Sequence, residues 1–309
     1  MKKEENKKLC FSVEEPRFSI KEHLILSKKT DVSLQECISK IKYHRVIYDE
    51  WDFKSVDPNG SSLIINFYGE PGTGKTLAAE AFAGTLKRKI IKVGIADIES
   101  KFMGDSAKNI KSVFELANEE QAILFFDEAD TMLGKRLSNV TQGTDNEVNS
   151  MRTTLLIELE KHDGIVIFAT NFIKNYDSAF ISRIGYQIEF ELPDLEARLK
   201  LWEKFLLPTI PFDGDKTETI ENLSEQSKGF SGRDIRKCLR LSLPKVFQHQ
   251  VGNYHLTQSI LMESLTDVSE SKNLLTSDRR KKANNITGVD QAVSLLGINK
   301  QEENTCGLV

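Results

Sequence analysis

The chain has 309 residues, enough for two domains of ~150 residues each, and its 39% hydrophobic and 28% charged residues are ordinary for a soluble globular protein. The formal net charge is -4, so the composition lacks the basic excess that binding of duplex DNA or RNA normally leaves. Nucleic acid is therefore a disfavoured partner.

The four cysteines, Cys10, Cys37, Cys238 and Cys306, lie far apart, and neither a CxxC pair nor a histidine spacing beside them matches a zinc site. We therefore expect reduced thiols and no zinc. The start, MKKEENKK, is charged with no apolar stretch behind it, and apolar runs such as AILFF are far shorter than the ~20 residues of a membrane-spanning helix. These features favour a cytoplasmic protein without a membrane segment.

The N-terminal part of the chain has no strand pattern. Residues 1–18 are polar and rich in lysine, which predicts a flexible tail. In the linker that follows, residues 19–60, apolar side chains recur at helical spacing and predict a helix over 34–47; they are Leu34, Cys37, Ile38, Ile41 and Val46.

Five short runs rich in Ile, Val and Phe alternate with helical patterns between residues 61 and 194. They occupy residues 63–68, 89–93, 122–126, 164–169 and 186–192. Each run is apolar on both faces, as expected of parallel strands that are covered by helices. This region is therefore predicted to be an α/β domain, a doubly wound parallel sheet in an αβα sandwich.

After residue 194 the strand pattern stops. Helices are predicted over 196–206, 218–227 and 232–247, which gives a small helical domain at 195–266. Residues 267–309 are predicted to be a polar C-terminal segment. Its stretch SDRRKKANN, which contains the basic run 279–282, is interpreted as solvated, with a subunit or nucleic-acid contact as the alternative.

The stretch GEPGTGKT, residues 69–76, satisfies the phosphate-binding pattern G-x-x-x-x-G-K-[ST], follows a predicted strand and opens a predicted helix. Its glycines let successive N–H groups turn toward a phosphate, and the helix N-terminus adds the positive end of its dipole. Lys75 is expected to reach the β- and γ-phosphates of ATP, and Thr76 to bind Mg²⁺. The predicted ATP-binding residues of this stretch are Glu70, Pro71, Gly72, Thr73, Gly74, Lys75, Thr76 and Leu77.

A second motif, ILFFDEAD at residues 123–130, places two carboxylates directly after an apolar strand. Ligands of open α/β sheets bind at the carboxyl ends of the strands, so these side chains are expected beside the phosphate loop. Asp127 can hold Mg²⁺, and Glu128 can polarise a water molecule toward the γ-phosphate. On their own, such carboxylates would more often cap a helix.

These motifs, in this order, resemble the AAA+ ATPases, and within them the ring-forming protein remodellers, over about residues 61–247. The resemblance implies a P-loop AAA+ module at 61–194 with a helical lid at 195–266. Asn171, which ends the strand IFATN, matches the sensor-1 position that helps to place the attacking water. Arg183 matches the second of the two arginines in the family's arginine-finger segment, where the spacing here is shorter and the first is missing. Arg233, in GFSGRDIRKCL, matches the sensor-2 region, with a solvated helix N-terminal arginine as the alternative.

In the same family, an aromatic–hydrophobic–glycine triplet after the second strand faces the channel of the ring and grips a polypeptide. Phe102, Met103 and Gly104 match that triplet by position and type, and packing into the local core is the alternative interpretation. Residues 137–145 match the place of a second channel loop, and Asp163-Gly164 resembles an intersubunit signalling element.

The leading hypothesis is thus an ATPase that uses Mg²⁺ and ATP, assembles as a homo-oligomer, expected to be a hexamer, and pulls on a protein substrate directly or through an adaptor. One alternative is an AAA+ nucleotide switch that acts on DNA or on a HORMA-domain-type protein. The stretch GFSGRDIRK resembles a small single-ring group of the family that remodels HORMA-domain proteins. Another is a small-molecule or nucleotide kinase, which would share the phosphate loop but would not need the DEAD motif, an asparagine sensor and a trailing arginine.

Overall fold

The computed structural model describes residues 11–57, 60, 62–98, 105–134, 143–171, 176–249, 252 and 254–274. The chain divides into two compact units. The first comprises Met1–Lys204 and Ser224–Arg233, and the second comprises Phe205–Leu223 and Asp234–Val309. The predicted division into an ATP-binding core and a lid after residue 194 stays a prediction.

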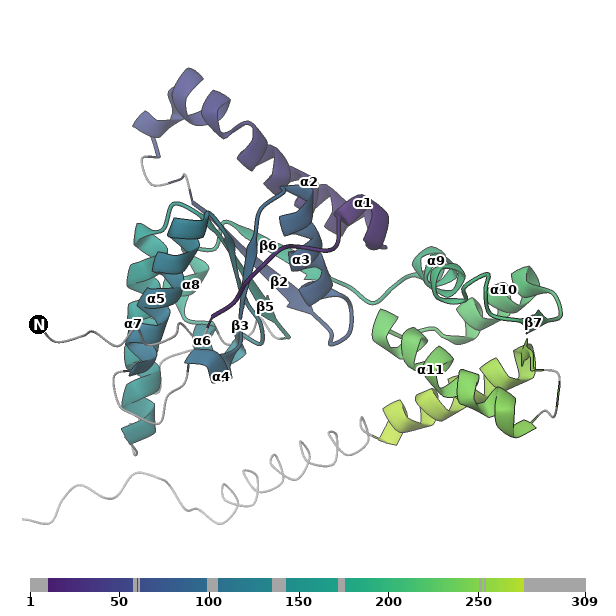
Figure 1. Cartoon of the computed structure of the whole chain (residues 1–309). Helices are drawn as coiled ribbons and strands as arrows, with labels where there is room; N and C mark the ends of the chain where they lie inside the picture. Colours follow the sequence, from purple (N-terminus) through teal and green to yellow (C-terminus); the bar gives the residue numbers. More distant parts are fainter. Residues whose placement is uncertain are drawn as a thin grey trace, which may run out of the picture. The chain divides into compact units, whose positions relative to one another are not determined.

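The first unit is built on a six-stranded sheet in the order β1-β3-β4-β5-β2-β6, which is parallel except for β1 (Figure 1). The strands are β1 (Val13–Glu14), β2 (Leu63–Gly69), β3 (Ile90–Val93), β4 (Ile123–Phe126), β5 (Ile165–Thr170) and β6 (Tyr186–Phe190). The five predicted runs therefore all form strands. The order places β2, with the phosphate loop at its end, directly beside β5.

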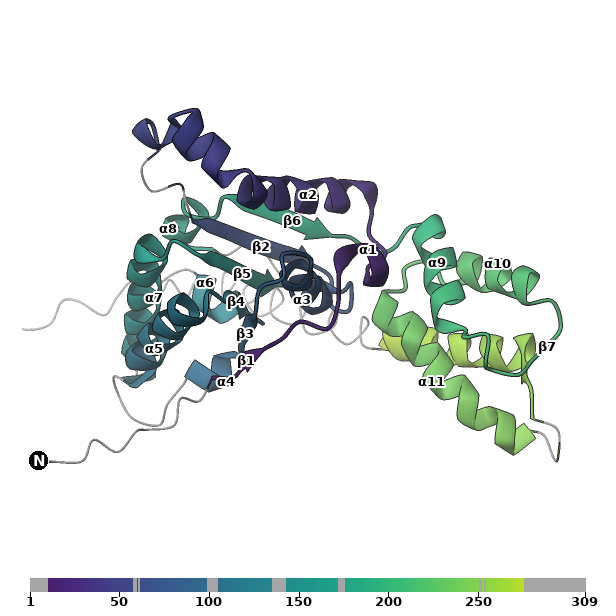
Figure 2. The same ribbon diagram turned by 45° about the horizontal axis from the view of Figure 1, so that its top comes forward.

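Helices cover both faces of this sheet (Figure 2). The main ones are α2 (Lys28–Lys42) and α3 (Lys75–Thr85) on one face, and α5 (Asp105–Glu120) and α7 (Gly143–Lys161) on the other. Side chains of β4 alternate between the two resulting cores: Ile123 and Phe125 pack with α3, whereas Leu124 and Phe126 pack with α5 and α7. This burial on both faces explains the unbroken apolar runs in the sequence.

Further helices complete the first unit: α1 (Ile20–His23), α4 (Ile95–Ile98), α6 (Asp130–Leu133), α8 (Ser178–Ile181) and all but the last residue of α9 (Leu195–Phe205). The helix predicted over 34–47 begins earlier, as α2, because Ser27 caps it by accepting a hydrogen bond from the Thr30 N–H. It ends at Lys42, and a five-residue π-helix, Val46–Glu50, and a short 3₁₀ helix, Phe53–Ser55, follow.

The prediction of a flexible tail through residue 18 is wrong for residues 11–18. Val13–Glu14 pair antiparallel with β3, and Arg17 donates to the carboxylate of Glu80 on α3 from both its backbone N–H (3.2 Å) and its Nε (3.1 Å). Gly84 of α3 allows this close crossing, since a Cβ there would lie 2.0 Å from the Phe18 carbonyl oxygen. The N-terminal segment is therefore part of the first unit.

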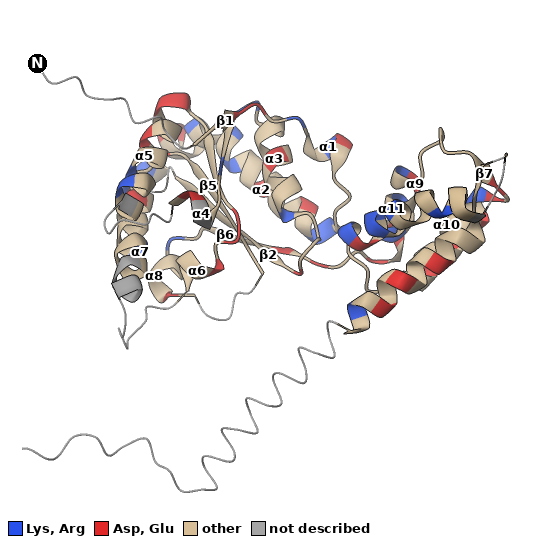
Figure 3. Cartoon of the chain, turned by 60° about the horizontal axis from the view of Figure 1, so that its bottom comes forward, with Lys and Arg blue, Asp and Glu red and all other residues tan. Residues whose placement is uncertain are grey.

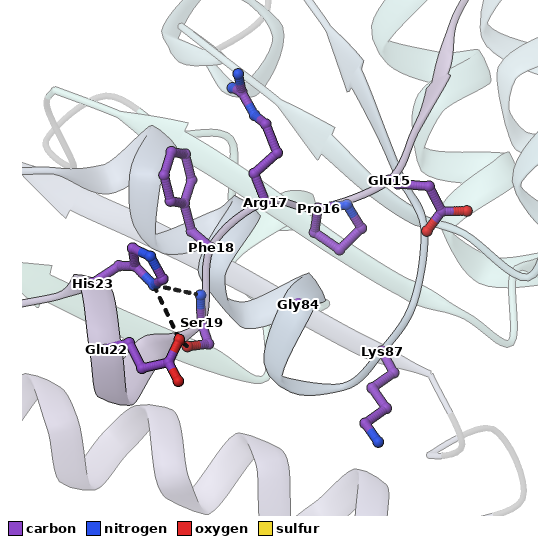
Figure 4. Close-up of a pocket in the computed structure, with 9 residues that line it drawn as sticks. All are labelled: Glu15, Pro16, Arg17, Phe18, Ser19, Glu22, His23, Gly84 and Lys87. Carbon is purple, nitrogen blue, oxygen red and sulfur yellow. Dashed lines mark hydrogen bonds and ion pairs between the residues drawn. The ribbon is translucent and has the colours of Figure 1, made fainter.

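Where this segment crosses the end of α3, it borders a pocket of about 350 Å³ (Figure 4). In the pocket wall the Ser19 N–H donates to His23 Nδ1 (3.1 Å), and Ser19 Oγ donates to Glu22 (3.0 Å). The wall also includes Gly84 and Lys87, so the pocket lies at the opposite end of α3 from Lys75. It is separate from the predicted phosphate site.

The second unit contains β7 (Phe212–Asp213), most of α10 (Lys216–Gln226) and α11 (Gly232–His249), β8 (Leu256–Thr257) and a helix over 258–274. Lys245 of α11 donates to Glu263 (2.6 Å) and Asp267 (2.7 Å) of that last helix, and Figure 3 colours the acidic positions along the ribbon red. The boundary predicted at residue 267 lies inside this helix, which continues to residue 274 and buries Val268. Among the described residues, none of the helices is both long and apolar enough to cross a membrane.

Candidate nucleotide-binding site

The phosphate loop joins β2 to α3, as the motif predicts. Lys75, the first residue of α3, is buried, and its Nζ donates to the carbonyl oxygens of Gly69 (2.7 Å) and Glu70 (3.0 Å) and to Oδ1 of Asn171 (3.1 Å). Three acceptors satisfy the three donors of the ammonium group. The lysine is thereby held at the carboxyl ends of β2 and β5.

Burial lowers the pKa of Lys75 below its ordinary value, and the nearby carboxylates of Asp127 and Asp130 oppose this effect. Desolvation disfavours a charged ammonium, whereas negative neighbours favour it. A phosphate at this loop would add further negative charge. The site is therefore arranged to hold a cationic lysine beside an anion.

The acidic motif lies beside the loop. Thr76 Oγ1 donates to Oδ2 of Asp127 at 3.0 Å, so the two predicted Mg²⁺ ligands are adjacent oxygen groups. Oxygen donors of this kind are the ligands that Mg²⁺ prefers, so the residues fit the ion. The next residue, Glu128, is exposed and has a left-handed backbone with φ 52°. Its N–H donates to Oδ1 of Asp127 (2.9 Å). Such backbone strain at a non-glycine residue is typical of functional positions.

Asn171 follows β5 at the same edge of the sheet, and its position is fixed from two sides. Its side chain accepts from Lys75, and its backbone N–H donates to both carboxylate oxygens of Asp130 (3.2 and 3.3 Å). Asp130 is the last residue of the DEAD motif, but no role for it was predicted from the sequence. In the structure its carboxylate orients the backbone of Asn171 by accepting from the N–H group of that residue.

Arg233 also reaches the phosphate loop. Its backbone N–H donates to the Gly72 carbonyl oxygen at 3.2 Å, and its guanidinium is close enough to Lys75 to lower the pKa of that lysine. Gly72 has φ 83°, and a Cβ on it would lie 2.7 Å from Ser231 Oγ and 2.8 Å from Arg233 Cβ. The GFSG turn therefore packs directly on the loop, where only glycine fits. The Arg233 side chain itself is exposed.

Arg183 has a different environment. Its Nη1 donates to the Ala179 carbonyl oxygen (2.7 Å), its Nη2 pairs with Glu160 at the end of α7, and its Nε is buried without a hydrogen-bond partner among the described residues. These contacts within the described part of the chain are with α7 and α8 and not with the phosphate loop. Phe102, Met103 and Gly104 lie outside the described residues, as do residues 137–142 of the predicted second channel loop.

A buried polar cluster behind Asn171 was not predicted. Asn66 of β2 donates from Nδ2 to the Tyr176 hydroxyl (3.4 Å), Tyr176 donates to Thr170, and Thr170 donates back to Asn66 Oδ1 (3.3 Å). Each of the three residues is at most 5% exposed. Thr170 immediately precedes Asn171, so this cluster supports the strand end that carries the predicted sensor. A single polar residue in the apolar run LIINFY was the only sequence signal for it.

The fold and the site define a P-loop nucleotide-binding protein of the α/β class. Residues 65–192 match the family described as "ATPase family associated with various cellular activities (AAA)". The chain carries an AAA ATPase domain and has homologues among the proteasome-regulatory AAA proteins.

The similar proteins include a putative 26S proteasome regulatory subunit homolog of Methanocaldococcus jannaschii, 32% identical over 238 residues, which are 74% of this chain and 60% of that protein. The proteasome-activating nucleotidase of Saccharolobus solfataricus is 31% identical over 237 residues, 74% of this chain and 58% of its own length. The 26S proteasome subunit RPT4 of Saccharomyces cerevisiae is 32% identical over 214 residues, 67% and 48% of the two chains. This chain thus spans about half to three fifths of these relatives.

Among solved structures, the crystal structure of the FIGL-1 AAA domain in complex with ADP matches with a TM-score of 0.67 and 19% identity, and covers 87% of this chain and 92% of that chain. At this identity the match concerns the fold. It agrees with the predicted α/β module.

Proposed function

We propose that this chain binds ATP with Mg²⁺ and hydrolyses it to ADP and phosphate. The observation that carries the proposal is the meeting of three strand ends: Lys75 after β2, Asp127 after β4 and Asn171 after β5. Homology to proteins named as proteasome-activating nucleotidases supports hydrolysis over simple binding.

In the proposed reaction, the phosphate loop from Glu70 to Leu77 holds the phosphates through its N–H groups, and Lys75 donates to the β- and γ-phosphates. Thr76 and Asp127 would hold Mg²⁺, which neutralises the charge on the phosphate oxygens. Glu128 accepts a proton from the attacking water, and Asn171 orients that water. Arg233 contacts the γ-phosphate from the same subunit.

The test is a steady-state ATPase assay with matched variants. Lys75→Ala should lose nucleotide binding, and Glu128→Gln should bind ATP normally but hydrolyse it very slowly, because its phosphate contacts remain. Lys89→Ala and Glu120→Gln are the controls, since these two residues form a partly exposed ion pair with each other. EDTA should stop hydrolysis. Wild-type turnover by Glu128→Gln would contradict its role as the base.

We further propose that the protein assembles as a ring, expected to be a hexamer in the cytoplasm, and that it uses hydrolysis to pull on or disassemble a protein substrate. In this ring Arg183 acts as an arginine finger in the site of the neighbouring subunit, where such a group accelerates hydrolysis by ~10³–10⁵. Phe102, Met103 and Gly104 would grip the substrate in the channel. The named functions of the proteasomal relatives support this proposal.

Mixed assemblies test the trans role of Arg183. Subunits with Glu128→Gln cannot hydrolyse ATP but still offer Arg183, whereas subunits with Arg183→Ala keep their own Glu128. If the finger acts in trans, mixing the two inactive proteins should restore hydrolysis. No recovery from verified mixed rings would exclude a finger supplied in trans.

In the presence of ATP, the Glu128→Gln protein should also retain its client. A protein client would support remodelling, whereas a DNA client would support the alternative of a switch that acts on DNA.

A further inference from the structure

Two contacts with described residues of its own subunit hold the Arg183 side chain. Ala179, one turn earlier in the chain, accepts from Nη1, and Glu160, in the last turn of α7, pairs with Nη2. The Arg183 side chain is 29% exposed and that of Glu160 is 56% exposed. The two contacts hold the guanidinium from opposite nitrogens while the group still reaches solvent.

A guanidinium carries five N–H donors in a rigid plane. Two of them are used by Ala179 and Glu160, and the one on Nε is buried. Among the described residues, one hydrogen on each terminal nitrogen is therefore left without an acceptor, and two donors in one plane suit bidentate contact with a phosphate. Since an unrestrained arginine side chain loses much rotamer freedom when it binds, fixing it beforehand favours catalysis.

We infer that Glu160 is a positioning residue for Arg183: it orients the guanidinium so that its remaining donors point to the γ-phosphate bound by the neighbouring subunit. This inference rests on the proposed trans role of Arg183. Glu160 does not touch the nucleotide itself, so it acts only through the arginine.

The first test compares Glu160→Gln with Glu158→Gln, which makes the same charge change on the same helix. Within the described part of the chain, Glu158 forms no ion pair. In assembled protein, Glu160→Gln should lower kcat by about 10- to 100-fold, since a misplacement of about 1 Å can cost about 10²-fold. KM for ATP should change less than about twofold, because the phosphate loop is untouched. Glu160→Asp, which keeps the charge, should recover part of the rate.

A double-mutant cycle then tests whether Glu160 acts on kcat through Arg183. On an Arg183→Ala background, Glu160→Gln should have no further effect on kcat, whereas a purely structural role would lower the rate and the melting temperature on both backgrounds. In mixed rings, Glu128→Gln subunits should rescue Arg183→Ala subunits, but subunits with both Glu128→Gln and Glu160→Gln should rescue them about 10- to 100-fold less.

The outcomes distinguish a wrong assignment of Arg183 as the finger from a wrong assignment of Glu160 as its positioning residue. If Arg183→Ala keeps the wild-type kcat, the finger itself is misassigned, and the inference falls with it. If Arg183→Ala is inactive while Glu160→Gln has the wild-type or a higher kcat, only the positioning role is overturned. A loss of activity with Glu160→Gln that adds to that of Arg183→Ala overturns it as well.

Discussion

Removal of a single hydroxyl group, by Tyr176→Phe, should destabilise the first unit. The Tyr176 hydroxyl accepts from Asn66 Nδ2 and donates to Thr170, and all three residues are buried. Without it, the Asn66 amide keeps its bond from Thr170 but loses the acceptor of its N–H₂ group. A buried donor left unsatisfied costs ~1–3 kcal/mol. Because the lost Asn66 contact is long, at 3.4 Å, we expect a cost below the upper end of that range, ~2 kcal/mol.

The measurement is urea or thermal unfolding of the variant beside Tyr186→Phe. Tyr186 is a half-buried tyrosine of β6, and the described residues show no hydrogen bond from its hydroxyl. At 2–4 °C per kcal/mol for a unit of this size, Tyr176→Phe should lower Tm by ~4–8 °C, while the control should change it little.

A second comparison tests whether the unsatisfied buried amide of Asn66 causes the loss of stability. Replacing the whole cluster, by Asn66→Leu and Thr170→Val together with Tyr176→Phe, removes every buried polar partner, so it should cost less than the sum of the three single changes. Equal stability of Tyr176→Phe and Tyr186→Phe, or strict additivity of the cluster, would refute this account.

Three further predictions concern the rest of the first unit and the buried thiols. Gly84→Ala should displace the N-terminal segment, because its Cβ would lie 2.0 Å from the Phe18 carbonyl oxygen, and limited proteolysis should then cut that segment faster. Burial raises the pKa of Cys37 and of Cys238 to about 12, so both thiols should react with maleimide at pH 7.5 only after unfolding; rapid native labelling would contradict their burial. Burial lowers the pKa of His162 from 6.5 to about 4, so as the pH falls this residue binds a proton in the unfolded chain before it does so in the folded chain. This residue alone should therefore lower the free energy of unfolding by ~3 kcal/mol between pH 6.5 and 4. The variant His162→Asn should show a smaller loss of stability over that pH range.

The sequence determined the parts of this protein that depend on neighbouring residues. The glycines and Lys75 of the phosphate loop, the acidic motif from Asp127, and all five parallel strands could be predicted from it, because turn chemistry and apolar runs are local properties. Two segments were missed for a local reason as well. Strand β1 is only two residues long, too short for any periodicity, and the last helix is polar on its outer face beyond residue 266.

Only the tertiary structure decided which distant residues meet. Lys75 donates to Asn171 because the sheet places β2 beside β5, an order that hydrogen bonding between strands sets and that the chain order does not reveal. The same adjacency encloses Asn66, Thr170 and Tyr176 in one cluster. Local pattern could identify the groups that bind phosphate, but their orientation depends on packing between segments far apart in the sequence, and that packing is absent from any short stretch of the chain.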